Sequence, residues 1–144
     1  MRNNLLISLL ALGSLCVLTG VQAFGMDTTG LQVNVPFSFR VEKTVLPAGR
    51  YLITPVDIST PNLLVIRNED GGPALAVLTE PLSPRLNAPE KSELVFTRVG
   101  NLDYLTQIWD SDTNEGNGIP EKALTGQSNG SQAPQQHSIP AHKS

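Results

Sequence analysis

The sequence predicts a small all-β protein, an antiparallel β-sandwich or barrel of about six or seven short strands. Apolar and polar residues alternate over several short segments, which is typical of strands with one buried face. Gly, Pro, Asn and Asp separate these segments at short intervals. The connections leave no room for the helical crossovers that a parallel sheet needs. Together these features favour strands that follow one another through hairpins.

The clearest alternation lies between residues 31 and 41. One face of this predicted strand is entirely apolar and consists of Val33, Val35, Phe37, Phe39 and Val41. Phe and Val suit a pleated surface with one buried side. Pro36 falls on the other face and has no N–H to donate to a ladder. We therefore expect this strand to lie at a sheet edge or to be bulged at Pro36.

The next stretch predicts a short strand, a tight turn and a longer strand. The short strand covers residues 44–46, and the sequence LPAG at 46–49 is typical of a β-turn because Pro and Gly occupy favoured turn positions. Alternation then resumes over residues 50–56. Tyr51 lies on the same side of this strand as Ile53, and we expect Tyr51 to pack in the core.

Two motifs in these segments, VPFSFRV at 35–41 and LPAGRYLI at 46–53, resemble a family of small exported β-rich proteins from soil-type bacteria. The likeness covers residues 33–124, and its further matching pieces are LLVIRNEDG, ELVFTRVGNLDYLTQIW and IPEKAL. The family has no assigned activity, so the resemblance implies an exported β fold and no mechanism. Beyond IPEKAL the family pattern continues with basic residues, whereas this chain runs into a Gln/Ser-rich tail.

The second half of the chain predicts four more strands, at residues 62–68, 74–80, 93–99 and 102–109. The sequences EDGGP and GN lie between neighbouring strands and are strong signals for hairpin turns. Three prolines between residues 80 and 92 argue against a central strand or a helix, so we expect a surface loop there. Residues 119–124 predict one helical turn, which Pro120 could open.

Residues 1–23 have the features of a secretory signal. Arg2 precedes an apolar run of 14 residues, and small residues lead up to Ala23. A membrane anchor would need about 20 apolar residues, which is longer than this run. We expect cleavage after Ala23, a periplasmic or secreted protein, and no transmembrane segment in the mature chain.

The remainder divides into a single β domain at residues 24–125 and a disordered tail at residues 126–144. The tail has no aromatic residue and one large aliphatic residue, Ile139, so it cannot bury enough apolar surface to order itself. Cys16 is the only cysteine and lies in the signal. The mature chain therefore cannot form internal disulfides, thiolate metal sites or a thiol nucleophile.

Charge argues against nucleic acid as a partner. Removal of Arg2 with the signal leaves 9 Lys and Arg against 13 Asp and Glu, a net charge of −4. The basic residues are scattered along the chain, so the basic stripe that nucleic-acid binding requires is missing. An envelope protein or a glycan fits this exported chain better.

An acidic stretch after the last predicted strand resembles a calcium loop. Asp110, Asp112, Asn114 and Glu121 occupy positions 1, 3, 5 and 12 of a 12-residue EF-hand pattern. Position 6 requires Gly and is Glu115 here, and no flanking helices are expected. The alternative interpretation is a solvated acidic turn. Calcium-dependent adhesion stays open as a function that depends on these residues.

The sequence assigns no catalytic residue and no cofactor. Both histidines, His137 and His142, lie in the predicted tail, so the predicted domain has no base for Ser-His-Asp or Cys-His chemistry and no zinc ligands. A pair of carboxylates acting on a glycan or peptide remains as an alternative. Tyr104 and Trp109 are candidates for stacking on a ligand, although core packing is the usual fate of such residues. The first hypothesis is a non-catalytic exported module that binds or scaffolds.

Overall fold

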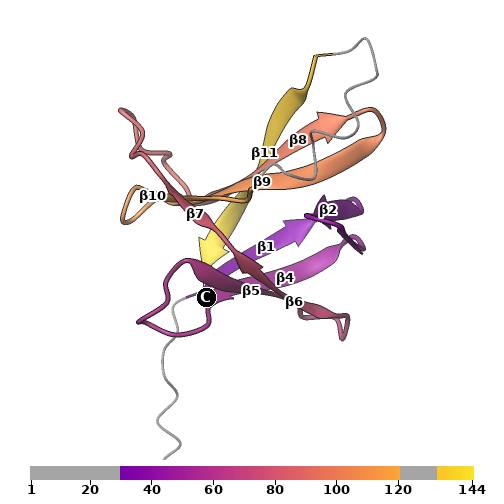
Figure 1. The fold of residues 1–144 in the computed structure, drawn as a ribbon, viewed down its shortest axis with the longest axis horizontal. Helices are drawn as coiled ribbons and strands as arrows, with labels where there is room; N and C mark the ends of the chain where they lie inside the picture. The colour runs from indigo at the N-terminus through magenta and orange to yellow at the C-terminus, as the bar shows by residue number, and fades with distance from the viewer. Residues whose placement is uncertain (1–29, 121–132) are drawn as a thin grey trace, which may run out of the picture.

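The computed structural model describes residues 30–120 and 133–144, and these residues form an all-β protein (Figure 1). One mixed sheet of 11 strands curls into a half-barrel. The strands are β1 (Leu31–Val35), β2 (Phe39–Val41), β3 (Thr44–Leu46), β4 (Gly49–Pro55), β5 (Leu63–Asn68), β6 (Ala74–Leu78), β7 (Glu80–Leu82), β8 (Glu93–Val99), β9 (Leu102–Asp110), β10 (Glu115–Gly118) and β11 (Gln135–Lys143). The predicted fold class is therefore confirmed at the level of all-β.

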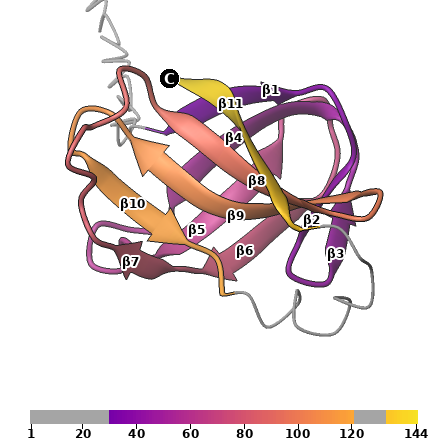
Figure 2. The same cartoon turned by 90° about the horizontal axis from the view of Figure 1, so that it is seen from above.

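The curled sheet has two layers that face each other across the core (Figures 1 and 2). The first layer contains β1, β4, β5 and β6, and the second contains β2, β3, β7, β8, β9 and β10. β11 belongs to both layers, because residues 135–140 pair with β8 and residues 141–143 pair with β1. The strand order across the sheet is β3-β2-β9-β8-β11-β1-β4-β5-β6, and off this path β10 pairs with β9 and β7.

Proline and short breaks mark the places where the chain passes between the layers. β1 ends at Val35 in the first layer, and β2 begins at Phe39 in the second. Pro36 lies in this break, where a missing N–H costs no ladder hydrogen bond. Pro140 lies at the corresponding position of β11, as the last residue that pairs with β8 and directly before the residues that pair with β1.

The core contains a cluster of aromatic rings between the layers. The ring centroid of Phe39 lies 5.2 Å from that of Tyr51 and 5.4 Å from that of Phe96, and both pairs meet edge to face. Such pairs contribute about 0.5–1.5 kcal/mol each beyond the burial of their area. Tyr51 is fully buried and its hydroxyl donates to the carbonyl oxygen of Pro47 at 2.6 Å. The prediction that Tyr51 packs in the core is confirmed.

The predicted strand count was too low, because two predicted strands divide and new ones appear. The predicted strand 31–41 is β1 and β2, and the predicted strand 74–80 ends at Leu78. The expected loop at 80–92 begins with the short strand β7, which pairs with β10. The prediction of a fully antiparallel sheet was also wrong, because β2 and β9 pair in parallel. This pairing follows from the change of layer, which brings β2 beside a strand that is distant in sequence.

The prediction that the C-terminal tail is disordered is wrong for residues 135–143. These residues form β11 in the middle of the sheet, between β8 and β1. His137 and Ile139 are half-buried and Ala141 is buried, while the residues between them are exposed. Backbone hydrogen bonds to two neighbouring strands order this segment although it buries little apolar surface. Composition alone does not reveal such neighbours.

Several predictions lie outside the described residues. They are the signal and its cleavage after Ala23, the first part of the tail at 126–132, and all but the first two residues of the expected helical turn at 119–124. In the two described ranges, no helix combines the length and the apolar character that crossing a membrane requires.

Candidate functional site

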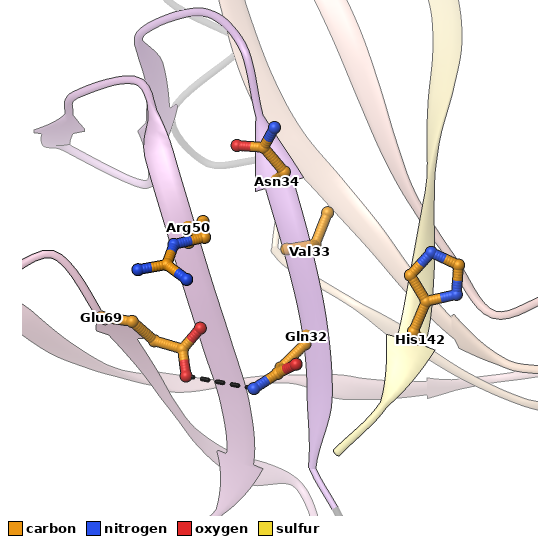
Figure 3. A pocket seen from close by; sticks show the side chains of 6 residues that line it. All are labelled: Gln32, Val33, Asn34, Arg50, Glu69 and His142. Atoms are coloured by element: carbon orange, nitrogen blue, oxygen red, sulfur yellow. Dashed lines mark hydrogen bonds between the residues drawn. The ribbon is translucent and has the colours of Figure 1, made fainter.

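A polar hollow lies on the outer surface of the first layer, where β11, β1 and β4 run side by side (Figure 3). It has a volume of about 400 Å³ and is open to solvent. Six residues line it, namely Gln32, Val33, Asn34, Arg50, Glu69 and His142. We call this surface the polar hollow.

Strand register brings its residues together from distant parts of the chain. Gln32 is opposite His142 on β11, and Asn34 is opposite Arg50 on β4. The alternate residues of β1 are buried, so Gln32 and Asn34 point outward. β11 therefore completes the hollow by placing His142 beside β1.

Hydrogen bonds fix the acidic side of the hollow. The Gln32 Nε2 donates to Glu69 Oε1 at 3.2 Å (Figure 3). The backbone N–H of Glu69 donates to the carbonyl oxygen of Arg50 at 2.8 Å. Glu69 belongs to the turn between β5 and β6, so these two contacts hold that turn against β4 and β1.

Arg50 is held by the carboxylate of Asp70. Its Nη2 and Nε donate to Asp70 Oδ1 at 2.9 and 3.3 Å, and its backbone N–H donates to Asp70 Oδ2 at 3.1 Å. These contacts lower the pKa of the Asp70 carboxyl below its usual value, and the hydrogen bond from the Arg50 backbone N–H contributes most to this shift. A general acid needs a pKa near the working pH, so Asp70 is suited to positioning Arg50 and not to proton transfer.

The chemistry of the hollow is that of hydrogen bonding to a polar ligand. Two amides, an imidazole, a guanidinium and a carboxylate face the same open space. Amides both donate and accept, the guanidinium only donates and the carboxylate only accepts. Because the cation and the anions already contact one another or a neighbouring amide, the hollow offers balanced polarity and no strong net field.

Trp109 and Tyr104, predicted as stacking residues, lie outside the polar hollow. Trp109 is 3% exposed, and the Arg85 guanidinium covers its ring at 4.0 Å from the centroid. The indole Nε1 donates to Gln107 Oε1 at 2.8 Å. Tyr104 is also 3% exposed. In this conformation neither ring presents an open face, so ligand stacking stays a prediction that would require rearrangement.

The acidic residues of the predicted calcium loop contact a lysine. The Lys143 Nζ lies 3.3 Å from Asp110 Oδ2 and 2.8 Å from Asp112 Oδ2. The hydrogen bond with Lys143 lowers the pKa of Asp112. Asn114 instead donates through Nδ2 to the carbonyl oxygen of Arg85 at 3.0 Å. The stretch forms the β9–β10 hairpin, because β10 begins at Glu115.

A metal ion at this hairpin would therefore have to compete with the Lys143 ammonium group for the carboxylates of Asp110 and Asp112. Glu121, the expected twelfth ligand, lies outside the described residues. Among residues 30–120 and 133–144, no three His, Cys, Asp or Glu side chains gather as a metal-binding group. The calcium hypothesis stays a prediction.

Sequence reasoning missed a second polar cluster, which β11 completes. Arg98 donates to both oxygens of Asp103 at 2.9 and 2.8 Å. His137 Nε2 lies 3.6 Å from Asp103 Oδ1, and the imidazole stacks on Phe96 with ring centroids 5.7 Å apart. The expectation that the folded domain lacks histidine was wrong. The period-two spacing of His137, Ile139 and Ala141 was the signal that could have revealed it.

Comparison of this chain with family models, with curated proteins and with solved structures finds no match.

Proposed function

We propose that this chain is a non-catalytic binding module that acts after export, and that the polar hollow holds a glycan of the cell envelope. The observation that carries the proposal is the convergence of Gln32, Asn34, Arg50 and His142 on one open surface. A small number of placed polar groups gives a ligand site its orientation and specificity, and Gln32 is held in place by Glu69. A hydroxyl-rich, uncharged ligand matches the balanced polarity of the hollow.

The proposal that the chain is exported rests on its sequence. The apolar run followed by small residues up to Ala23 supports a cleaved signal, and the resemblance to small exported β-rich proteins points the same way. Periplasmic or extracellular location would place the polar hollow where envelope glycans are available.

The carboxylates give no specific support to a hydrolase. Asp70 binds Arg50, Glu93 binds Arg85 at 2.6 Å, and Asp103 binds Arg98. A glycoside hydrolase needs one carboxyl whose pKa is raised so that it can donate a proton. The resolved shift at Asp70 is in the opposite direction.

Calorimetric titration tests the proposed function. The full mature chain is titrated with soluble fragments of bacterial cell-wall glycan and with a set of soluble polysaccharides. We expect at least one glycan to bind, and we expect Asn34→Ala and His142→Ala each to weaken that binding about tenfold, equivalent to about 1.4 kcal/mol.

The matched control is Gln136→Ala. Gln136 has an exposed amide side chain, as Gln32 and Asn34 do, but it is on β11. It is opposite Thr97 of β8 and lies outside the hollow. Its substitution should leave binding unchanged. Binding that survives both substitutions in the hollow, or the absence of binding to every glycan, would overturn the proposal.

A further inference from the structure

β11 is a central strand that contributes little to the core. It lies between β8 and β1 in the strand order and crosses from the second layer to the first (Figure 1). Of its nine residues, Ala141 alone is buried, whereas the neighbouring β8 buries four of its seven. Ala141 is also the one β11 residue in the core cluster of the described chain, against which Ile139 packs. Strands that are polar on both sides specify their pairing weakly and are prone to exchange between chains.

Backbone hydrogen bonds and polar side-chain contacts hold β11 in place. The Lys143 ammonium contacts the carboxylates of Asp110 and Asp112 at one end of the strand. Near the other end, His137 Nε2 lies 3.6 Å from Asp103 Oδ1. Water can replace each of these contacts, so withdrawing β11 costs less free energy than withdrawing a strand that fills the core.

Withdrawal of β11 would leave each layer with its own strand pairing. β1 would still pair with β4, and β8 would still pair with β9. The core cluster would lose one buried side chain, that of Ala141. Between the layers, however, the facing edges of β8 and β1 would both be unpaired, and unpaired edges are templates for a strand from another chain.

We propose that two copies of this chain exchange β11, so that the β11 of each copy lies between β8 and β1 of the other. An exchanged strand makes the same contacts as before, so no new surface has to be complementary. The contacts also identify the occupant, because an incoming strand must place a cation beside Asp110 and Asp112 and a small apolar side chain in the core. β11 meets both requirements with Lys143 and Ala141.

The connection to β11 is long enough for this exchange. Residues 119–134 separate β10 from β11 in the sequence. A chain of that length spans about 50–60 Å when fully extended. This exceeds the width of a domain of about 100 residues, whose radius of gyration is about 13 Å. A strand on such a connection can reach a neighbouring copy.

Exchange would build each polar hollow from two copies. Gln32, Asn34, Arg50 and Glu69 would come from one copy and His142 from the other. The dimer would present two hollows, so a glycan that reaches both would bind with avidity. This last consequence rests on the proposed function, whereas the exchange itself needs only the pairing of β11.

The tether sets the concentration at which exchange occurs. A strand on a flexible connection competes for its own site at an effective concentration of about 1 mM. We therefore expect monomers at micromolar concentrations and exchanged dimers when the protein concentration approaches this value. Dimers formed in this way should persist on dilution, because their separation requires β11 to leave both copies.

A disulfide that closes β11 onto its own chain tests the proposal. The full mature chain is incubated at about 1 mM in urea below the unfolding transition, returned to buffer, diluted and analysed by sedimentation velocity. Residues 24–144 contain no cysteine, and Gln32→Cys/His142→Cys joins opposite residues of β1 and β11. Oxidation of this variant before incubation should lower the dimer fraction at least about tenfold relative to its reduced form, because a strand closed into a ring cannot exchange.

The matched control closes a pair of strands that does not exchange. Thr54→Cys/Val65→Cys joins opposite residues of β4 and β5, and it should dimerise equally when oxidised and when reduced. A wild type that stays monomeric after this incubation would overturn the proposal. A dimer that forms equally with the β1–β11 disulfide closed would also overturn it, because association would then use another surface.

Mixing two single variants identifies the exchanged strand. Gln32→Cys chains incubated with His142→Cys chains should give a disulfide-linked heterodimer on oxidation, because the β11 of one copy lies beside the β1 of the other. Thr54→Cys chains mixed with Val65→Cys chains should not. Equal yields from the two mixtures would contradict the exchange. Glycan binding is measured separately on the micromolar monomer, so failure of the exchange and failure of the proposed function are distinguishable.

Discussion

Arg50 is the residue on which the arrangement of the polar hollow most depends. Its side chain and its backbone N–H both bind Asp70, and its carbonyl oxygen accepts from the N–H of Glu69. One residue of β4 thus orients both acidic residues of the β5–β6 turn. Glu69 in turn holds Gln32 of β1.

The pKa of Asp70 reports on this arrangement. It should lie below the usual value of about 3.9, because the backbone N–H and guanidinium of Arg50 stabilise the carboxylate. The stabilisation is present above the unfolded pKa and is lost as the pH falls through the lower folded pKa. Arg50→Gln should raise the Asp70 pKa only in part, since the backbone contact remains.

An NMR pH titration of the side-chain carboxyl measures this effect. The Lys43→Gln variant serves as a control, because Lys43 is an exposed cation on the β2–β3 turn. An Asp70 pKa at the usual value in the wild type would contradict the described contacts.

Individual side chains show the limits of sequence reasoning at this scale. Tyr51 was placed correctly because a period-two pattern assigns each residue of a strand to a face. Trp109 could not be placed, because its environment depends on Arg85, which lies in a proline-rich segment 24 positions earlier. No local pattern predicts that a loop folds back over a ring.

Among the elements, β11 contributes most to the site and was the hardest to predict. It supplies His142 to the polar hollow, His137 to the Asp103 cluster and Lys143 to the β9–β10 hairpin. Its sequence is mostly polar and contains Pro140, and its order comes from pairing with β8 on one side and β1 on the other. By contrast, β8 and β9 were predicted almost to the residue, because the GN turn fixes their pairing locally.

The inward side of β11 should be sensitive to charge. Ala141 is 2% exposed, so Ala141→Asp would bury a carboxylate and should lower the free energy of unfolding by about 3 kcal/mol or more. Ser138→Asp places the same group on the exposed side and should change it by less than about 0.5 kcal/mol. Urea denaturation measures both. Equal, small effects would mean that the segment is not a strand of the sheet.

At the scale of the whole molecule, the half-barrel turns two different surfaces of one layer outward. The half near β11 and β1 is polar, and the half over β5 and β6 is apolar. The sequence indicated an all-β fold because alternation and turn residues are local signals. It could not indicate which strands become neighbours, since β1 and β11 lie at opposite ends of the chain and meet only after folding.

The Gln32–His142 pair tests the central claim most directly, because the sheet order and the polar hollow both require it. NMR of the mature chain should show cross-strand nuclear Overhauser effects between the backbones of residues 32 and 142, together with strand-like chemical shifts over residues 135–143. Random-coil shifts for that segment, with no effect connecting it to β1, would contradict both the fold and the site.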